Sequence, residues 1–196
     1  PVPPKAQLTV FRAEIRYGVV WVALEEPIRP IPDLPLASDP RTRTIRQFDE
    51  VWKASAPRLI DNSFDPAHTT FVHRKTFGAN ADVQVPEVER TANGIVMRTE
   101  VKVKQVPGLE HITGDESEIT VRTVETTWWA PFFRVLDQTY PSGVRHTIAM
   151  SATPVDDTHL RLVQWVMRND TEAEVPAADV VAFDRRVTLE DKALPE

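Results

Sequence analysis

The sequence predicts an α+β domain, in which helices pack on a curved antiparallel β-sheet. Runs in which apolar and polar residues alternate fill much of the chain between residues 42 and 170, as is typical of strands. Two short turn sequences, at residues 140–143 and 156–157, separate the last of these runs, and such tight links favour antiparallel pairing. Helical patterns near residue 57 and after residue 176 supply helices to cover the sheet.

The first 40 residues predict a hairpin followed by a linker. Residues 7–24 alternate and then become apolar around Tyr17-Gly18, which indicates a β-hairpin that turns at the glycine. Residues 27–40 contain five prolines and show no periodicity, as in an extended linker. A two-stranded hairpin is too small to hold a core of its own. We therefore expect three parts: the hairpin in residues 1–26, the linker in residues 27–40 and the main domain in residues 41–196.

The remaining elements belong to the main domain. A strand is expected at residues 42–53, and a helix begins near Pro57 with Ser55 as its candidate N-cap. The chain ends in a charged, amphipathic helix over residues 176–196. Because the chain starts at Pro1 and stops inside this helix, we expect it to be a piece of a longer protein, truncated at its C-terminus. Further strands are expected at residues 81–88, 94–106, 117–129, 143–155 and 159–170.

Composition and charge restrict the classes of function. The net charge is -6 and no basic cluster occurs, which argues against nucleic acid or an anionic membrane surface as a partner. No apolar run approaches the roughly 18 residues needed to span a bilayer, and no signal-peptide pattern opens the chain, so a cytoplasmic location is expected. Without cysteine, these residues can hold no disulfide, zinc–thiolate site or cysteine-ligated iron–sulfur cluster.

Two of the five histidines lie five residues apart in the segment 61–73, DNSFDPAHTTFVH. On an ideal helix His68 and His73 would point about 140° apart, too far round to share one ion. Pro66 lacks an N–H and residues 69–72 are poor helix formers, so the sequence is compatible with a broken helix that brings the imidazoles together. Two imidazoles and one carboxylate would suit non-haem Fe(II), with zinc as the chemical alternative. A surface or packed pair of histidines is the alternative without metal.

The run 59–73, LIDNSFDPAHTTFVH, resembles the iron-site signature of Rieske non-haem iron oxygenase alpha subunits. This family contains the ring-hydroxylating dioxygenases and the monooxygenases similar to vanillate and dicamba demethylases. The aspartate-to-histidine and histidine-to-histidine gaps match, and the three-residue step from Asn62 to Asp65 resembles the monooxygenase and demethylase branch. Residues 17–24, YGVVWVAL, resemble the closing hairpin of a Rieske domain. Residues 185–196, RRVTLEDKALPE, resemble the C-terminal helix that carries an iron-binding aspartate.

The resemblance implies a set of metal ligands. His68, His73 and Asp191 would hold a mononuclear Fe(II). From the residues alone, Asp191 could equally be a solvated acid in a charged helix, and Asp184 or Glu190 could be mistaken for the ligand.

Two further residues gain a role from the resemblance. Asp65 would bridge an iron histidine to a Rieske-cluster histidine of the adjacent subunit and so form the route for electrons. It also fits the N-cap of a turn that starts at Pro66. Asn62 would lie near the iron without firm ligation, or be an ordinary polar residue of a helix.

The same resemblance implies cofactors, partners and a reaction. Residues 41–196 would form a helix-grip, START-like catalytic domain, and the hairpin in residues 1–26 would be the end of a Rieske domain. The [2Fe–2S] cluster needs two cysteines, so we expect it in an upstream domain before Pro1. Electrons would come from NAD(P)H through a ferredoxin, a reductase or both. With dioxygen, the enzyme would hydroxylate an aromatic or other cyclic organic substrate, or remove an O- or N-methyl group. The family implies a homotrimer, and the isolated fragment is expected to be inactive.

Two other functions compete with this hypothesis. A metal-free protein with the same helix-grip fold could bind a hydrophobic ligand, since fold does not determine function. A zinc hydrolase could use the same three ligands, although no general base is evident beside the histidines. The aromatic residues Trp128, Trp129, Phe132 and Phe133 fit core packing better than a pocket wall. No role is assigned to His111, His146 and His159.

Overall fold

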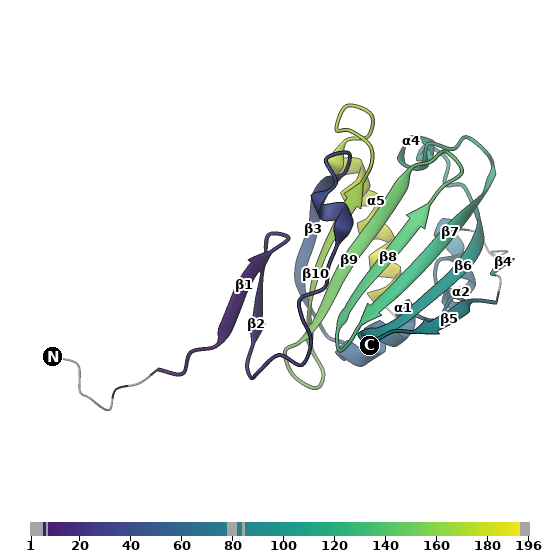
Figure 1. The fold of residues 1–196 in the computed structure, drawn as a ribbon. Helices are drawn as coiled ribbons and strands as arrows, with labels where there is room; N and C mark the ends of the chain where they lie inside the picture. The colour runs from purple at the N-terminus through teal and green to yellow at the C-terminus, as the bar shows by residue number, and fades with distance from the viewer. Residues whose placement is uncertain (1–5, 7, 78–81, 84, 193–196) are drawn as a thin grey trace.

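The computed structural model describes residues 6, 8–77, 82–83 and 85–192 of the chain (Figure 1). None of its helices is long and apolar enough to cross a membrane in this described part of the chain. The helices are α1 (Ala56–Ser63), α2 (His68–Phe71), α3 (Arg74–Phe77), α4 (Glu110–Thr113) and α5 (Ala177–Lys192), with a short 3-10 helix at Pro35–Ser38. The strands are β1 (Arg12–Arg16), β2 (Val19–Ala23), β3 (Arg43–Trp52), β4 (Asp82–Val83), β5 (Glu87–Arg90), β6 (Gly94–Lys104), β7 (Ile119–Trp129), β8 (Phe133–Thr139), β9 (Arg145–Pro154) and β10 (Leu160–Arg168).

An eight-stranded antiparallel sheet forms the centre of the molecule. Its strand order is β3-β10-β9-β8-β7-β6-β4, and β5 pairs with β6 on the same edge as β4. α1 and α5 lie against one face of this sheet (Figure 1). The β1–β2 hairpin is a separate two-stranded sheet that packs on the opposite face. The predicted class, α+β with helices packed on an antiparallel sheet, is confirmed.

Most of the expected elements occur within a few residues of their predicted bounds. The expected strand at residues 81–88 is instead two short strands, β4 and β5, and Ala81 and Gln84 lie outside the described residues. The expected C-terminal helix is α5, and residues 193–196 also lie outside the described part. Ser55 occupies the N-cap position of α1, but its side chain makes no capping hydrogen bond.

Strand β8 was not predicted from the sequence, and its absence from the prediction is wrong. Arg134, Leu136 and Gln138 face the helices, whereas Phe133 and Val135 face the hairpin. Because polar and apolar side chains occur on both faces, the alternation that identifies a half-buried strand is absent.

The hairpin is joined to the outer face of the sheet by its turn. Tyr17 and Gly18 both have positive φ, 57° and 69°, which is the backbone of a tight type I′ hairpin turn. The Tyr17 hydroxyl donates to the Pro32 carbonyl at 2.9 Å and accepts the Leu34 N–H at 2.8 Å, so it also holds the proline-rich segment. The division into residues 1–26, 27–40 and 41–196 stays a prediction, and residues 1–5 and 7 lie outside the described part.

The four aromatic residues of segment 128–133 separate onto two faces of the sheet. Trp128 and Phe132 pack against the apolar cluster between α1 and the sheet. Trp129 and Phe133 pack against the apolar cluster between the hairpin and the other face of the sheet. None of the four lines the central cavity described below. The core-packing interpretation is therefore confirmed for this group.

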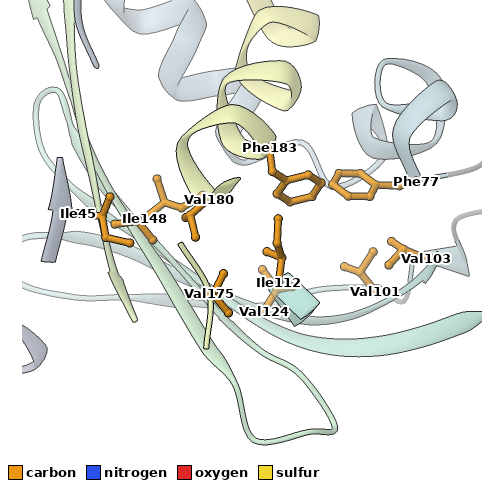
Figure 2. Packing of buried hydrophobic residues seen from close by; sticks show 11 residues of the cluster. Ile45, Phe77, Val101, Val103, Ile112, Val124, Ile148, Val175, Val180 and Phe183 are labelled. Atoms are coloured by element: carbon orange, nitrogen blue, oxygen red, sulfur yellow. The ribbon is translucent and has the colours of Figure 1, made fainter. Parts of the chain in front are cut away.

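Helix α5 is held against the sheet by a continuous apolar core. Val180 and Phe183 lie on the side of α5 that faces the strands, between Ile148 and the ring of Phe77 (Figure 2). The Phe77 and Phe183 rings meet edge to face, with centroids 6.2 Å apart. This packing determines where the last turn of α5 lies.

We expect Phe183→Ala to lower the free energy of unfolding by about 3–5 kcal/mol, because it leaves a cavity under α5. Leu189→Ala on the same helix is the matched control: Leu189 is 43% exposed whereas Phe183 is 9% exposed, so its cost should stay near 0.5 kcal/mol or less, about that of a surface substitution. Urea denaturation of both variants measures the difference. Equal losses would show that α5 is not held by this core.

Candidate metal centre

The chain between α1 and α3 is a broken helix, as the histidine spacing required. α1 ends at Ser63, α2 spans His68–Phe71, and His73 directly precedes α3. The Asp65 carboxylate accepts the Ala67 backbone N–H at 2.9 Å. This bond satisfies the first backbone donor after Pro66, which agrees with a capping role for Asp65. The break turns both imidazoles towards one point.

Three side chains from distant parts of the chain meet there. His68 Nε2 and His73 Nε2 lie 3.2 Å apart. Asp191 Oδ1, from the last turn of α5, lies 3.1 Å from His73 Nε2 and 3.6 Å from His68 Nε2. The three residues that the resemblance singled out are thus brought together by the fold.

The geometry of these three atoms fits a single bound ion. Ligand atoms about 2.1 Å from one ion lie roughly 3.0 Å apart on an octahedral face and roughly 3.4 Å apart in a tetrahedron. The observed separations of 3.1, 3.2 and 3.6 Å lie close to these two values. Two imidazole nitrogens and one carboxylate oxygen, without sulfur, form the donor set of non-haem Fe(II) sites with open positions. The residues therefore fit mononuclear iron, and the same donor set also suits zinc.

Neighbouring side chains orient these ligands. Glu190 Oε2 accepts a hydrogen bond from His73 Nδ1 at 2.9 Å, and Glu190 Oε1 accepts one from Thr76 at 2.7 Å. The bond from His73 Nδ1 to Glu190 fixes the ring so that its other nitrogen, Nε2, points towards Asp191. Asn62 Nδ2 donates to Asp191 Oδ1 at 3.0 Å, so Asn62 lies beside the candidate centre. Sequence reasoning named Glu190 only as a residue that could be mistaken for the ligand. In the structure Glu190 is hydrogen-bonded to His73 and is not among the three candidate ligands.

Burial and charge act in opposite directions on the His73–Asp191 pair. Burial alone would lower the pKa of His73, but the hydrogen bonds and charges of Asp191 and Glu190 outweigh it and raise that pKa. Burial alone would raise the pKa of Asp191, but contact with His73, the charge of His68 and the Asn62 amide lower it. Asp191 is thus an ionised carboxylate at neutral pH, the form that binds a cation.

A cavity of about 120 Å³ lies between the sheet and the helices and includes the three candidate ligands in its wall. Most of the wall is apolar, with Met97, Val124, Leu136 and Ile148 from the sheet. Several polar side chains project from the same face of the sheet, and sequence reasoning gave none of them a role. The strand that carries two of them, β8, was not expected, and which residues of the other strands face inward depends on strand register. These polar side chains are Arg122, Arg134, Gln138, His146 and Gln164.

The family model of the vanillate O-demethylase oxygenase C-terminal domain matches residues 52–196. The chain belongs to this family, the C-terminal catalytic domain of Rieske oxygenases. It is similar to methylxanthine N3-demethylase NdmB of Pseudomonas putida, with 25% identity over 203 residues that cover 100% of this chain and 54% of that protein. It is 37% identical to methylxanthine N1-demethylase NdmA of Pseudomonas putida over 78 residues, which are 39% of this chain and 22% of that protein.

Solved structures of this family share the fold. NdmA of Pseudomonas putida CBB5 with caffeine superimposes with a TM-score of 0.73 at 24% identity, covering 99% of this chain and 55% of that one. Dicamba monooxygenase bound to dicamba gives a TM-score of 0.74 at 17% identity, with 95% of this chain and 58% of that one covered. The Rieske oxygenase domain described here thus spans about half the length of the proteins it matches.

Two further histidines form carboxylate pairs with α5 away from the candidate centre. His146 Nε2 lies 3.1 Å from Asp184, and both side chains are almost completely buried. His111 Nε2 lies 3.2 Å from Asp179, and this pair is exposed. Asp184 is therefore already paired with His146, and its carboxylate does not join the group formed by His68, His73 and Asp191.

We expect Asp184→Ala to cost about 1–3 kcal/mol of unfolding free energy for each buried donor left unpaired, namely those of His146 and Gln47. Asp179→Ala removes the exposed pair on the same helix and should cost less than about 1 kcal/mol. Urea titrations of the two variants test the ranking, and a reversed order would contradict the burial assigned to Asp184.

Proposed function

We propose that His68, His73 and Asp191 hold a mononuclear Fe(II) and that the complete protein is a Rieske oxygenase that removes a methyl group from a small organic substrate. The observation that carries this proposal is the convergence of the three ligand atoms in the wall of a mostly apolar cavity between the sheet and the helices. The names of the relatives, demethylases that act on N-methyl groups and a monooxygenase bound to dicamba, support oxidative demethylation over ring hydroxylation.

The residues of this chain then have distinct tasks. All three ligands line the cavity, so a substrate inside it lies beside the centre. When bound, Fe(II) supplies the redox chemistry that dioxygen requires. Glu190 keeps His73 in the tautomer that presents Nε2 to the ion. The apolar wall keeps water away from the reacting methyl group.

The electron route is also part of the proposal. Asp65 is exposed in the loop between α1 and α2, and its backbone carbonyl contacts His68 Nδ1. It joins His68 to a [2Fe–2S] cluster of a neighbouring subunit in a homotrimer. NAD(P)H supplies the electrons through a ferredoxin or reductase, and the cluster lies in a Rieske domain of which residues 1–26 are the end and residues 27–40 the linker. The exposure of Asp65 beside His68 supports this role.

We expect the protein to bind close to one Fe(II) per chain under anaerobic conditions. His73→Ala and Asp191→Ala should each weaken binding by more than about 100-fold, since even outer partners of metal ligands contribute about 10- to 100-fold. His159→Ala is the matched control, because His159 lies in an exposed turn, where it contacts Asp156. Equilibrium dialysis with iron analysis gives the affinities.

Three outcomes separate the candidate functions. Iron binding that survives both ligand substitutions contradicts the proposed centre. Strong preference for zinc over iron supports the hydrolase alternative, which shares these ligands. Absence of metal binding in the parent, with uptake of apolar ligands, supports the metal-free carrier.

We expect Glu190→Ala to weaken Fe(II) binding about 10- to 100-fold, because His73 Nδ1 loses its acceptor. Glu190→Gln retains an acceptor oxygen and should lie closer to the parent. Glu116→Gln, at an exposed position, is the control. The same dialysis assay applies, and an unchanged affinity in Glu190→Ala would exclude an orienting role.

A further inference from the structure

Arg134 projects from β8 into the cavity with donors that nothing in the described part of the chain satisfies. Its Nε and Nη1 atoms are shielded from solvent and have no hydrogen-bond partner among the described residues. The guanidinium also forms no ion pair within 4.0 Å in that part of the chain. A guanidinium has five N–H donors and no acceptor, and unpaired buried donors are costly. A protein tolerates such a group where something else supplies the acceptor.

The charge on Arg134 persists despite its burial. Burial lowers its pKa to about 10, and the charges of Asp191 and Asp184 act in the opposite direction. The side chain therefore remains protonated at neutral pH. The cavity wall holds a positive charge without a hydrogen-bonded counter-ion.

The carboxylates near Arg134 are already engaged by other groups. Asp191 contacts His73 and accepts from Asn62. Asp184 contacts His146 and accepts from Gln47. A divalent ion at the candidate centre would take up the charge of Asp191 as well, which leaves Arg134 still less compensated.

Arg122, the other arginine in the cavity wall, has more of its guanidinium engaged by protein groups. Arg122 donates from Nη1 to Gln138 at 2.9 Å, and its guanidinium lies 4.6 Å from the centre of the Phe77 ring. The Arg122 charge is thus partly stabilised by Gln138 and the Phe77 ring. Arg122 keeps one buried donor atom, Nε, without a partner among the described residues, whereas Arg134 keeps two, Nε and Nη1.

We propose that Arg134 binds the carboxylate of the substrate, which is an anionic molecule with a single aromatic ring. This inference rests on the proposed function and adds the substrate class to it. A carboxylate accepts two parallel N–H bonds from a guanidinium, the strongest common pairing for that group. The cavity volume of about 120 Å³ is close to the ~150 Å³ of engineered apolar cavities that take up benzene, so it suits one ring. Anchoring the carboxylate would orient the ring relative to His68, His73 and Asp191.

The test uses pairs of ligands that differ only in charge. The three methoxybenzoate isomers are each compared with the corresponding neutral methoxybenzamide by isothermal titration calorimetry on the full chain, metal-free and loaded anaerobically with Zn²⁺ to prevent turnover. At least one benzoate should bind the parent at least 10-fold more tightly than its benzamide. Arg134→Gln should weaken that benzoate by about 10- to 150-fold, the range for hydrogen bonds to charged groups, and should change benzamide binding less than threefold.

Matched variants separate a binding role from a structural one. Arg134→Lys keeps the charge and should retain part of the benzoate preference. Arg161→Gln removes one positive charge from β10 outside the cavity, where Arg161 pairs with Asp49, and should bind like the parent. Because removal of an unpaired buried charge relieves a cost, the urea midpoint of Arg134→Gln should equal or exceed that of the parent. A lower midpoint together with unchanged benzoate affinity would assign Arg134 to the structure instead.

The outcomes also separate this inference from the proposed function. If the parent binds Fe(II) but no benzoate isomer is preferred over its benzamide, or Arg134→Gln leaves the preference intact, the inference is overturned and the iron centre stands. If the parent binds no Fe(II) but the metal-free chain prefers a benzoate through Arg134, the proposed reaction fails while the anion site remains.

Discussion

The packing of α5 across the sheet is the constraint on which the candidate centre depends. Asp191 is more than a hundred residues from the histidines in sequence, so only tertiary packing can bring it to them. Val180 and Phe183 anchor the helix in the apolar core, and Asp184 adds a buried contact to His146. With these positions held, the helical repeat of α5 turns Asp191 towards His73 and Glu190 towards its other ring nitrogen. One helix therefore supplies both a ligand and the group that orients a second ligand.

The inner face of the sheet carries polar groups where an ordinary core would be apolar. Arg122, Arg134 and Gln164 all project from it, and each keeps at least one buried polar atom without a partner in the described structure. Such atoms reduce stability. Local rules of folding are commonly broken at functional sites. The polar groups gather around the same cavity as the candidate ligands, so this loss of stability coincides with the place where a substrate would bind.

The sequence predicted the sheet and the broken helix for clear physical reasons, and it could not supply the rest. Alternation identified β6, β7, β9 and β10, and the five-residue histidine gap required a break between His68 and His73, which lies between α2 and α3. Asp191 came from family resemblance, because Asp184, Glu190 and Asp191 are equivalent acids in a charged helix until packing distinguishes them. Arg134 was invisible because β8 lacks alternation, and which residues of a strand face inward is fixed only by its register with its neighbours.

Strand β8 links the two sides of the molecule. Phe133 packs on the outer face against Trp21 of the hairpin, with ring centroids 5.3 Å apart, and the next residue, Arg134, points into the cavity. A one-residue slip of β8 would exchange these two side chains between faces. The hairpin contact therefore stabilises the register that places a guanidinium inside. The packing of the hairpin and the position of the cavity arginine are therefore connected through adjacent residues of one strand.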